Sequence, residues 1–199
     1  MGMALETEPR YWIPEDVLAL PADGNRYECI DGELLVSPAP PWPHQLVVSE
    51  LHARLFGYLR DRSVGVMLIA PADVRLETSS IVQPDLFVVP RSVAPVTATD
   101  WTALDRLLLA VEVLSPSTAR YDRLTKRAFY QRAGVDEYWI VDRHARVVER
   151  WCPTDERPEI VATELRWKPV GAADPLVIDL PRIFADAARQ ADDAGIAWE

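Results

Sequence analysis

The runs IVQPDLFVV (residues 81–89) and LLLAVEVLS (residues 107–115) decide the fold of this chain. Both are apolar, rich in β-branched residues and of strand length, and a strand this apolar is usually buried on both faces. Each run carries one acid in its interior, Asp85 or Glu112. A buried carboxylate is costly unless it is paired or binds a metal, so two neighbouring strands with one acid each suggest a shared cation. In the alternative interpretation, both acids stand at strand ends and face water.

The segments around these runs alternate between helical and strand patterns. Asp31-Gly32 separates two short apolar runs and predicts a β-hairpin. A variable loop is expected at residues 90–105. The helices are predicted at residues 14–20, 44–62, 121–133 and 181–194, and the other strands at 26–30, 33–37, 65–77, 137–142, 147–152, 160–167 and 176–179. This order favours an α/β (α+β) fold in which helices flank a central mixed sheet.

The size of the chain indicates one globular domain over residues 1–199, because 199 residues with 49% hydrophobic content suffice for one core. Within it we expect an irregular N-terminal segment at 1–25, a core at 26–185 and a C-terminal tail at 186–199. The net charge of -10 argues against a protein that coats nucleic acid non-specifically, although a local basic groove remains compatible with it.

Several features of the sequence predict a cytoplasmic protein that does not act at a membrane. The N-terminus lacks a basic region followed by an apolar run, so no signal peptide is predicted, and no apolar stretch is long enough to span a bilayer. Cys29 and Cys152 do not have the spacing of metal ligands. Two free thiols in a cytoplasmic protein are the simpler interpretation, with a disulfide as the alternative.

Lysine is rare in this chain, since only Lys126 and Lys168 are lysines among 21 basic residues. A lysine is a compact charge whose pKa moves on burial, so Lys126 can deprotonate or orient a water molecule. The alternative is a helix lysine that faces solvent. The segment around it is basic and follows the Glu112 strand, which suggests a phosphate-facing patch rather than a simple solvated face. Its basic residues are Arg120, Arg123, Lys126, Arg127 and Arg132.

A set of short motifs lies in order along the chain: YECIDGE at 27–33, HQ at 44–45, PD at 84–85, EVLSPS at 112–117, Asp122, Lys126, Tyr130 and GVDEYWIVD at 134–142. This set resembles the Uma-two family of endonucleases, which belongs to the PD-(D/E)xK superfamily. The resemblance covers about residues 10–185. It implies a restriction-endonuclease-like, nuclease core in which helices flank a central mixed β-sheet, with an N-terminal β-hairpin.

The resemblance also implies a metal site and a reaction. Asp85 and Glu112 are the expected Mg²⁺ ligands, with the carbonyl of Val113 as a third and with Mn²⁺ as a substitute ion. The implied reaction is hydrolysis of phosphodiester bonds in nucleic acid, with DNA as the expected substrate. One position departs from the superfamily motif, because Leu114 stands where the motif has lysine. Lys126 on the following helix is the candidate to take over that role.

Three further residues are secondary candidates for the site. Glu28 and Glu33 flank the predicted hairpin turn, and His44 opens a predicted helix. The alternatives are that Glu28 and Glu33 are exposed hairpin acids and that His44 is a capping or hydrogen-bonded histidine.

The leading hypothesis is therefore a Mg²⁺-dependent endonuclease in which Asp85 and Glu112 hold the metal and Lys126 assists the attacking water. A second hypothesis is a catalytically silent, nuclease-derived module for DNA binding or assembly, which the acidic charge and Leu114 favour. A third is a hydrolase of small phosphoesters. Nucleic acid is the expected partner, and the edge strands of the sheet together with the resemblance suggest a homodimer.

Overall fold

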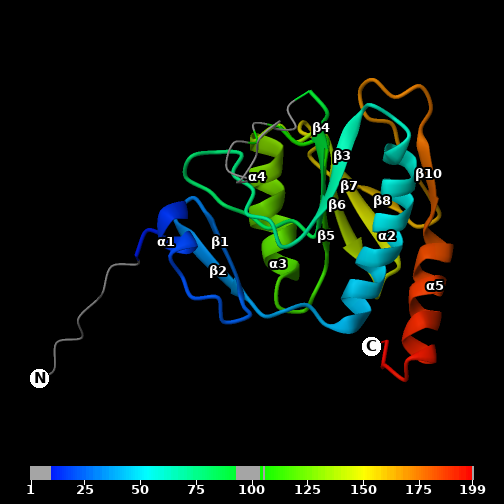
Figure 1. Cartoon of the computed structure of the whole chain (residues 1–199), viewed down its shortest axis with the longest axis horizontal. Helices are drawn as coiled ribbons and strands as arrows, with labels where there is room; N and C mark the ends of the chain where they lie inside the picture. Colours follow the sequence, from blue (N-terminus) through cyan, green and yellow to red (C-terminus); the bar gives the residue numbers. More distant parts are fainter. Residues whose placement is uncertain (1–9, 93–103, 105, 199) are drawn as a thin grey trace, which may run out of the picture.

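The runs that carry Asp85 and Glu112 lie side by side at the centre of a six-stranded mixed sheet (Figure 1). The computed structural model describes residues 10–92, 104 and 106–198. The strand order is β3-β4-β5-β6-β7-β8, with β5 and β6 parallel and the other pairs antiparallel. The strands are β3 Gly65–Ile69, β4 Leu86–Pro90, β5 Leu109–Val113, β6 Tyr138–Asp142, β7 Val147–Trp151 and β8 Glu159–Val161.

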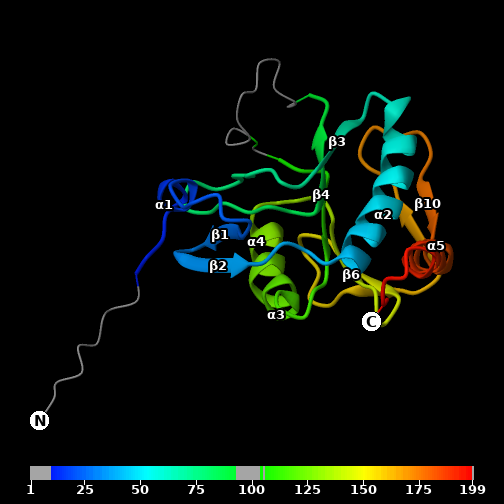
Figure 2. The same ribbon diagram turned by 60° about the horizontal axis from the view of Figure 1, so that its bottom comes forward.

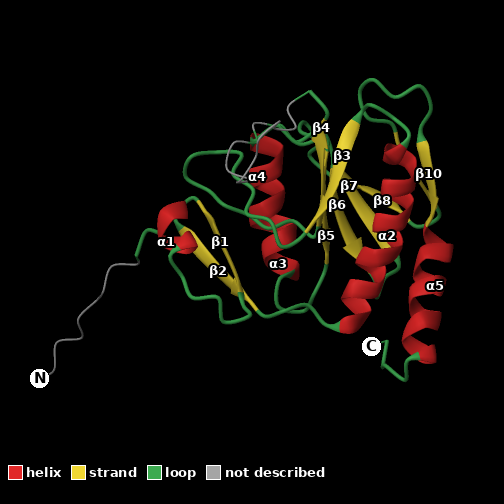
Figure 3. Ribbon diagram, viewed as in Figure 1, coloured by secondary structure: helices red, strands yellow, loops and turns green. Residues whose placement is uncertain are grey.

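Helices cover both faces of this sheet (Figure 3). On one face lie α2 (Trp42–Arg60) and α5 (Leu180–Asp193), beside the two-stranded sheet of β9 (Glu164–Trp167) and β10 (Leu176–Asp179). On the other lies a helical segment made of α3 (Ala119–Tyr121), the π-helical turn η1 (Asp122–Lys126) and α4 (Arg127–Arg132). This arrangement confirms the predicted fold class. None of the helices in the described part of the chain has the length and apolar character needed to cross a membrane.

The alternation of side chains along the central strands explains why each face has its own core. Leu86 and Val88 of β4 belong to the apolar cluster under α2 and α5, whereas Phe87 belongs to the cluster under α4. On β5, Val111 belongs to the first cluster. Because successive strand side chains point to opposite faces, Glu112 points to the face that α4 covers.

The predicted hairpin forms a separate two-stranded sheet on the same side as α4 (Figure 2). Its strands are β1 (Arg26–Ile30) and β2 (Glu33–Ser37), and the short helix α1 (Pro14–Leu18) packs beside it. Asp31 and Gly32 form its turn with φ values of 50° and 87°, which suit a two-residue hairpin turn. Cys29 exchanges two backbone hydrogen bonds with Ile81, and this bridge links the hairpin to the chain before β4.

Three of the predicted elements were wrong in extent. The strand predicted at 81–89 begins only at Leu86, because Pro84 cannot donate a hydrogen bond to a ladder. Asp85 therefore stands just before the strand and not inside it. The strand predicted at 65–77 ends at Ile69, and the one predicted at 160–167 is split between β8 and β9, which belong to different sheets.

Two further predictions concern helices. The helix predicted at 121–133 is present but includes the π-helical turn, and the helix predicted at 181–194 is present as α5. Ala187 and Ala191 of α5 are fully buried in the core. Most of the loop predicted at 90–105, and the first nine residues of the predicted N-terminal segment, lie outside the described residues.

Candidate active site

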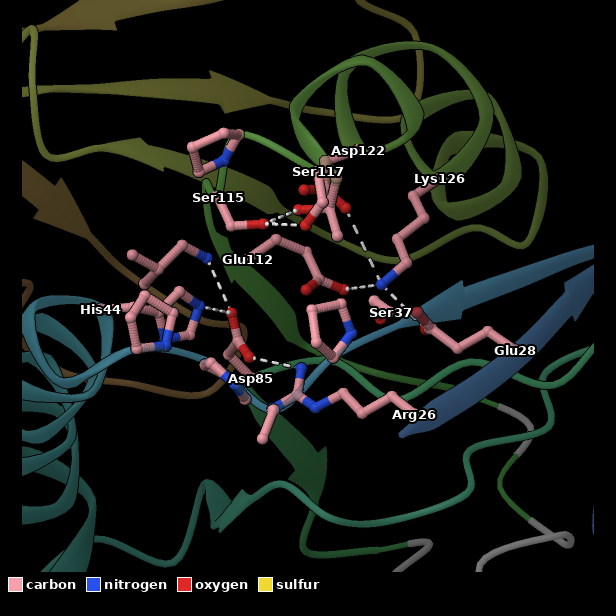
Figure 4. A pocket seen from close by; sticks show the side chains of 17 residues that line it. Arg26, Glu28, Ser37, His44, Asp85, Glu112, Ser115, Ser117, Asp122 and Lys126 are labelled. Carbon is pink, nitrogen blue, oxygen red and sulfur yellow. Dashed lines mark hydrogen bonds and ion pairs between the residues drawn. The ribbon is translucent and has the colours of Figure 1, made fainter. Parts of the chain in front are cut away.

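A pocket of about 190 Å³ opens where the hairpin, the start of α2, the end of β5 and the segment α3–η1 meet (Figure 4). Charged side chains from four of these elements and from the residue before β4 line it. They are Arg26, Glu28, His44, Asp85, Glu112, Asp122 and Lys126. The two acids of the central strand runs thus enter one pocket.

The side chain of Asp85 is only 2% exposed. Three hydrogen-bonding partners hold its carboxylate. Nη1 of Arg26 donates to Oδ1 at 2.8 Å, Nε2 of His44 lies 3.0 Å from Oδ2, and the backbone N–H of Val113 donates to Oδ2 at 2.9 Å. Burial raises the pKa of Asp85, but the hydrogen bond from His44 and the charge of Arg26 outweigh it and hold the pKa well below its usual range. Asp85 is therefore a buried carboxylate that stays ionised.

The Val113 contact follows from the register of the sheet. The ladder between β4 and β5 begins with Leu86 opposite Val111, so the amide of Val113 extends beyond it and meets the Asp85 side chain. In a strand, the N–H and C=O groups of one residue project to the same side. The carbonyl of Val113 therefore lies on the side of β5 that faces Asp85.

Lys126 is surrounded by acids. Its Nζ lies 2.8 Å from Oε1 of Glu112, 2.8 Å from Oε1 of Glu28 and 3.8 Å from Oδ1 of Asp122. Burial lowers the pKa of Lys126, but Glu112, Glu28 and Asp122 raise it well above its usual value, so the side chain is an ammonium. Glu28 also accepts a hydrogen bond from the backbone N–H of Gln83 at 2.7 Å, which fixes its carboxylate.

Burial raises the pKa of two acids beside Lys126, those of Glu112 and Asp122. It raises the pKa of Glu112 well above its usual value, since Lys126 offsets only part of the cost and Asp85 adds to it. It raises the pKa of Asp122 to about 6, against the influence of Lys126. The hydroxyl of Tyr130 donates to Oε1 of Glu112 at 3.3 Å. Glu112 thus has two donors on a single oxygen.

The helical segment explains how these groups meet. Asp122, Lys126 and Tyr130 are spaced four residues apart, and residues with this spacing lie on one face of a helix. That face lies over the side of β5 from which Glu112 projects. The π-helical turn spans Asp122 to Lys126, and π turns inside helices occur frequently at functional sites.

The donor set suits a divalent cation. The pocket contains four carboxylates, those of Glu28, Asp85, Glu112 and Asp122, against two permanent cations and one histidine. Oδ1 of Asp122 is buried without a hydrogen-bond partner. Mg²⁺ is usually held by one or two carboxylates together with water and substrate oxygens. Residues 10–92, 104 and 106–198 contain no group of three or more His, Cys, Asp or Glu side chains placed to hold a metal ion.

The structure brings together all but one of the candidates named from the sequence. Asp85, Glu112, Val113, Lys126, Glu28 and His44 all line the pocket. Glu33 does not: it is exposed and lines a separate hollow beside Tyr11 and Trp12. Glu33 lies opposite Ile30 at the turn end of the hairpin, on the same face as Glu28, whereas the pocket is lined by Arg26, Glu28 and Ser37 farther from the turn.

Sequence reasoning missed Arg26 and did not assign a role to Asp122 or Tyr130. Arg26 had a usable signal, because it stands two residues before Glu28 and must share its face of β1. Asp122 and Tyr130 had another, their spacing of four residues from Lys126.

Two arginines of the basic helical segment are paired with acids of the same chain and not directed at the pocket. Arg123 is paired with Asp142 at 2.9 Å and with Glu149 at 2.6 Å. Arg132 is paired with Glu77 at 3.0 Å and with Asp31 at 3.1 Å. These arginines hold the helix to other parts of the chain.

Comparison with known proteins agrees with this architecture. A crystal structure described as "a putative nuclease belonging to DUF820", from Anabaena variabilis ATCC 29413, is similar with a TM-score of 0.70 and 16% sequence identity. The similarity covers 87% of this chain and 97% of that chain, and it shows a shared fold. No curated protein matches the chain. The family model Uma2, described as "Putative restriction endonuclease", matches residues 14–184, and the chain therefore belongs to the Uma2 family.

Proposed function

We propose that this protein is a Mg²⁺-dependent endonuclease that hydrolyses phosphodiester bonds in DNA. One observation carries the proposal. Asp85 and Glu112, contributed by neighbouring strand runs, enter one pocket in which the Lys126 ammonium lies 2.8 Å from Glu112. Membership of the family described as "Putative restriction endonuclease" supports the assignment.

In this mechanism Asp85, Glu112 and the carbonyl of Val113 would hold the metal. A bound Mg²⁺ supplies a Lewis acid that offsets the charge developing on the phosphate. Arg26 and His44 fix the Asp85 carboxylate from one side of the pocket.

Lys126 takes the place of the motif lysine that Leu114 cannot supply. Leu114 is buried in the apolar cluster under α4, where it has no polar atom to offer. An ammonium has three N–H donors, and Lys126 uses two of them on Glu112 and Glu28 at 2.8 Å. We assign the third donor to the attacking water, which Lys126 would orient toward the phosphorus while its charge stabilises the transition state.

The test is a cleavage assay on circular plasmid, linear duplex and single-stranded DNA, and on RNA, with Mg²⁺, Mn²⁺ or EDTA. Linearisation of the plasmid with metal and none with EDTA is the expected result for the wild type. The variants Glu112→Gln and Lys126→Met are expected to lose at least 100-fold in rate, whereas Lys168→Met, which alters the exposed second lysine, keeps the wild-type rate.

Other outcomes identify the alternatives. Retention of DNA without cleavage under any metal would support the silent binding module, which Leu114 and the net charge of -10 favour. Turnover of bis(p-nitrophenyl) phosphate without cleavage of nucleic acid would support the small-phosphoester hydrolase. The homodimer stays a prediction, which light scattering on the purified protein tests.

A further inference from the structure

We propose that Arg26 binds the phosphate group of the substrate, in addition to holding Asp85. The proposal rests on the proposed function and names the residue that recognises the anionic part of the substrate in the same pocket. Arg26 comes from the β1–β2 hairpin, which lies outside the six-stranded sheet.

The contacts of Arg26 leave most of its donors available. A guanidinium has five N–H donors in a planar fork. Of the hydrogen bonds described for Arg26, one is made by its side chain, from Nη1 to Oδ1 of Asp85 (Figure 4). A guanidinium held by one arm can donate through the other arm to a phosphate oxygen without leaving its carboxylate.

Exposure separates Arg26 from the other cationic groups of the pocket. Its side chain is 18% exposed, against 2% for Lys126 and 4% for His44. Lys126 is enclosed by three acids, and His44 is directed at Asp85. Arg26 is therefore the pocket cation that a phosphodiester arriving from solvent can reach.

The charge of the pocket gives this contact its importance. Four acids line the pocket against two permanent cations, so a phosphate that approaches before the metal is bound has few groups that can attract it. Two arginines of the helical segment, Arg123 and Arg132, are committed to acids elsewhere. Within the described pocket lining, Arg26 is the accessible group that attracts the substrate.

The experiment compares Arg26→Met with a matched control, Arg75→Met. Arg75 is also paired at 2.8 Å with one carboxylate, that of Glu15, and its side chain is 19% exposed, but it does not line the pocket. Binding of a fluorescein-labelled DNA duplex is measured by anisotropy in EDTA over a series of salt concentrations. Binding of Mn²⁺ to each protein is measured by calorimetry.

Arg26→Met is expected to weaken DNA binding about tenfold and to reduce the salt dependence of log K by about 1, because one phosphate contact is lost. Its affinity for Mn²⁺ is expected to be no weaker than that of the wild type, since a cation beside Asp85 has been removed. Arg75→Met is expected to match the wild type in both measurements. A role for Arg26 confined to holding Asp85 would leave the DNA affinity and the salt slope unchanged.

Wild-type DNA affinity and salt slope in folded Arg26→Met would overturn the assignment of Arg26, and the proposed function would stand if that protein still cut DNA. A wild-type protein that neither binds nor cuts nucleic acid overturns the proposed function and the Arg26 assignment with it. If Arg26→Met does not fold, Arg26→Lys decides. A lysine keeps the ion pair but lacks the second arm of the fork, so its DNA affinity is expected to fall, and wild-type affinity would refute the proposal.

Discussion

Replacing Lys126 by methionine removes one buried charge while keeping a long, unbranched side chain in its place. In the native protein the ammonium is 2% exposed and is shared by Glu112, Glu28 and Asp122. In the variant these three acids stay buried without their common cation.

The cost follows from that arrangement. Removing one partner of a buried ion pair costs about 3 to 5 kcal/mol, because the remaining charge is left uncompensated. Lys126 serves two acids at 2.8 Å, but the raised pKa of Glu112 allows that acid to take up a proton in the variant, so we place the loss of unfolding free energy within that range. For a protein of this size, a loss of that magnitude lowers Tm by on the order of 10 °C.

The assay is urea denaturation followed by circular dichroism in EDTA, with Lys168→Met as the control at an exposed lysine. The control is expected to change the unfolding free energy by less than about 0.5 kcal/mol. Combining Lys126→Met with Glu112→Gln removes one of the stranded charges and should recover about 1 to 3 kcal/mol of coupling energy. A loss below about 1 kcal/mol for Lys126→Met would refute the reasoning, because it would mean that the three acids do not depend on the lysine.

The remaining predictions concern four acids. Glu28→Gln is expected to lower the unfolding free energy by about 2 kcal/mol, as loss of a charge-assisted hydrogen bond requires, whereas Glu33→Gln on the same hairpin changes it by less than about 0.5 kcal/mol in urea titrations. Asp85→Asn is expected to weaken Mn²⁺ binding at least tenfold in calorimetry, and equal affinity would remove Asp85 from the metal site. Burial raises the pKa of Asp142, but backbone amides and Arg123 lower it overall from 3.8. Its contribution to stability is therefore present above pH 4 and lost below, so thermal melts of Asp142→Asn should show a shallower loss on acidification than those of the wild type.

The central strands and the hairpin could be predicted because their signals are local. The apolar runs at residues 81–89 and 107–115, and the Asp31-Gly32 turn, each specify their own conformation. The start of β4 was missed by several residues, because the strand pattern continues through Ile81 and Val82. Those two residues form isolated bridges to other partners, Cys29 and Val74, which no local pattern reveals.

The residues of the candidate site could be predicted only where side-chain alternation or the family resemblance identified them. Neither distinguishes Glu28 from Glu33, since both flank one turn and only the docking of the hairpin decides which acid is buried. The ion pairs of Arg123 in the basic helical segment could not be predicted, for a related reason. The partners of Arg123 lie 19 and 26 residues away, and whether a basic residue faces a substrate or an acid of its own chain depends on such distant contacts.

The hairpin has a consequence for how the site can be lost. One strand, β1, supplies both Arg26 to Asp85 and Glu28 to Lys126, yet it belongs to a sheet of only two strands. Partial opening of a small unit requires less free energy than global unfolding. Detachment of these ten or so residues would separate both charge pairs at once while the six-stranded sheet stayed intact. Amide hydrogen exchange at Cys29 and Ile81 therefore reports how often an otherwise folded molecule is temporarily without its site.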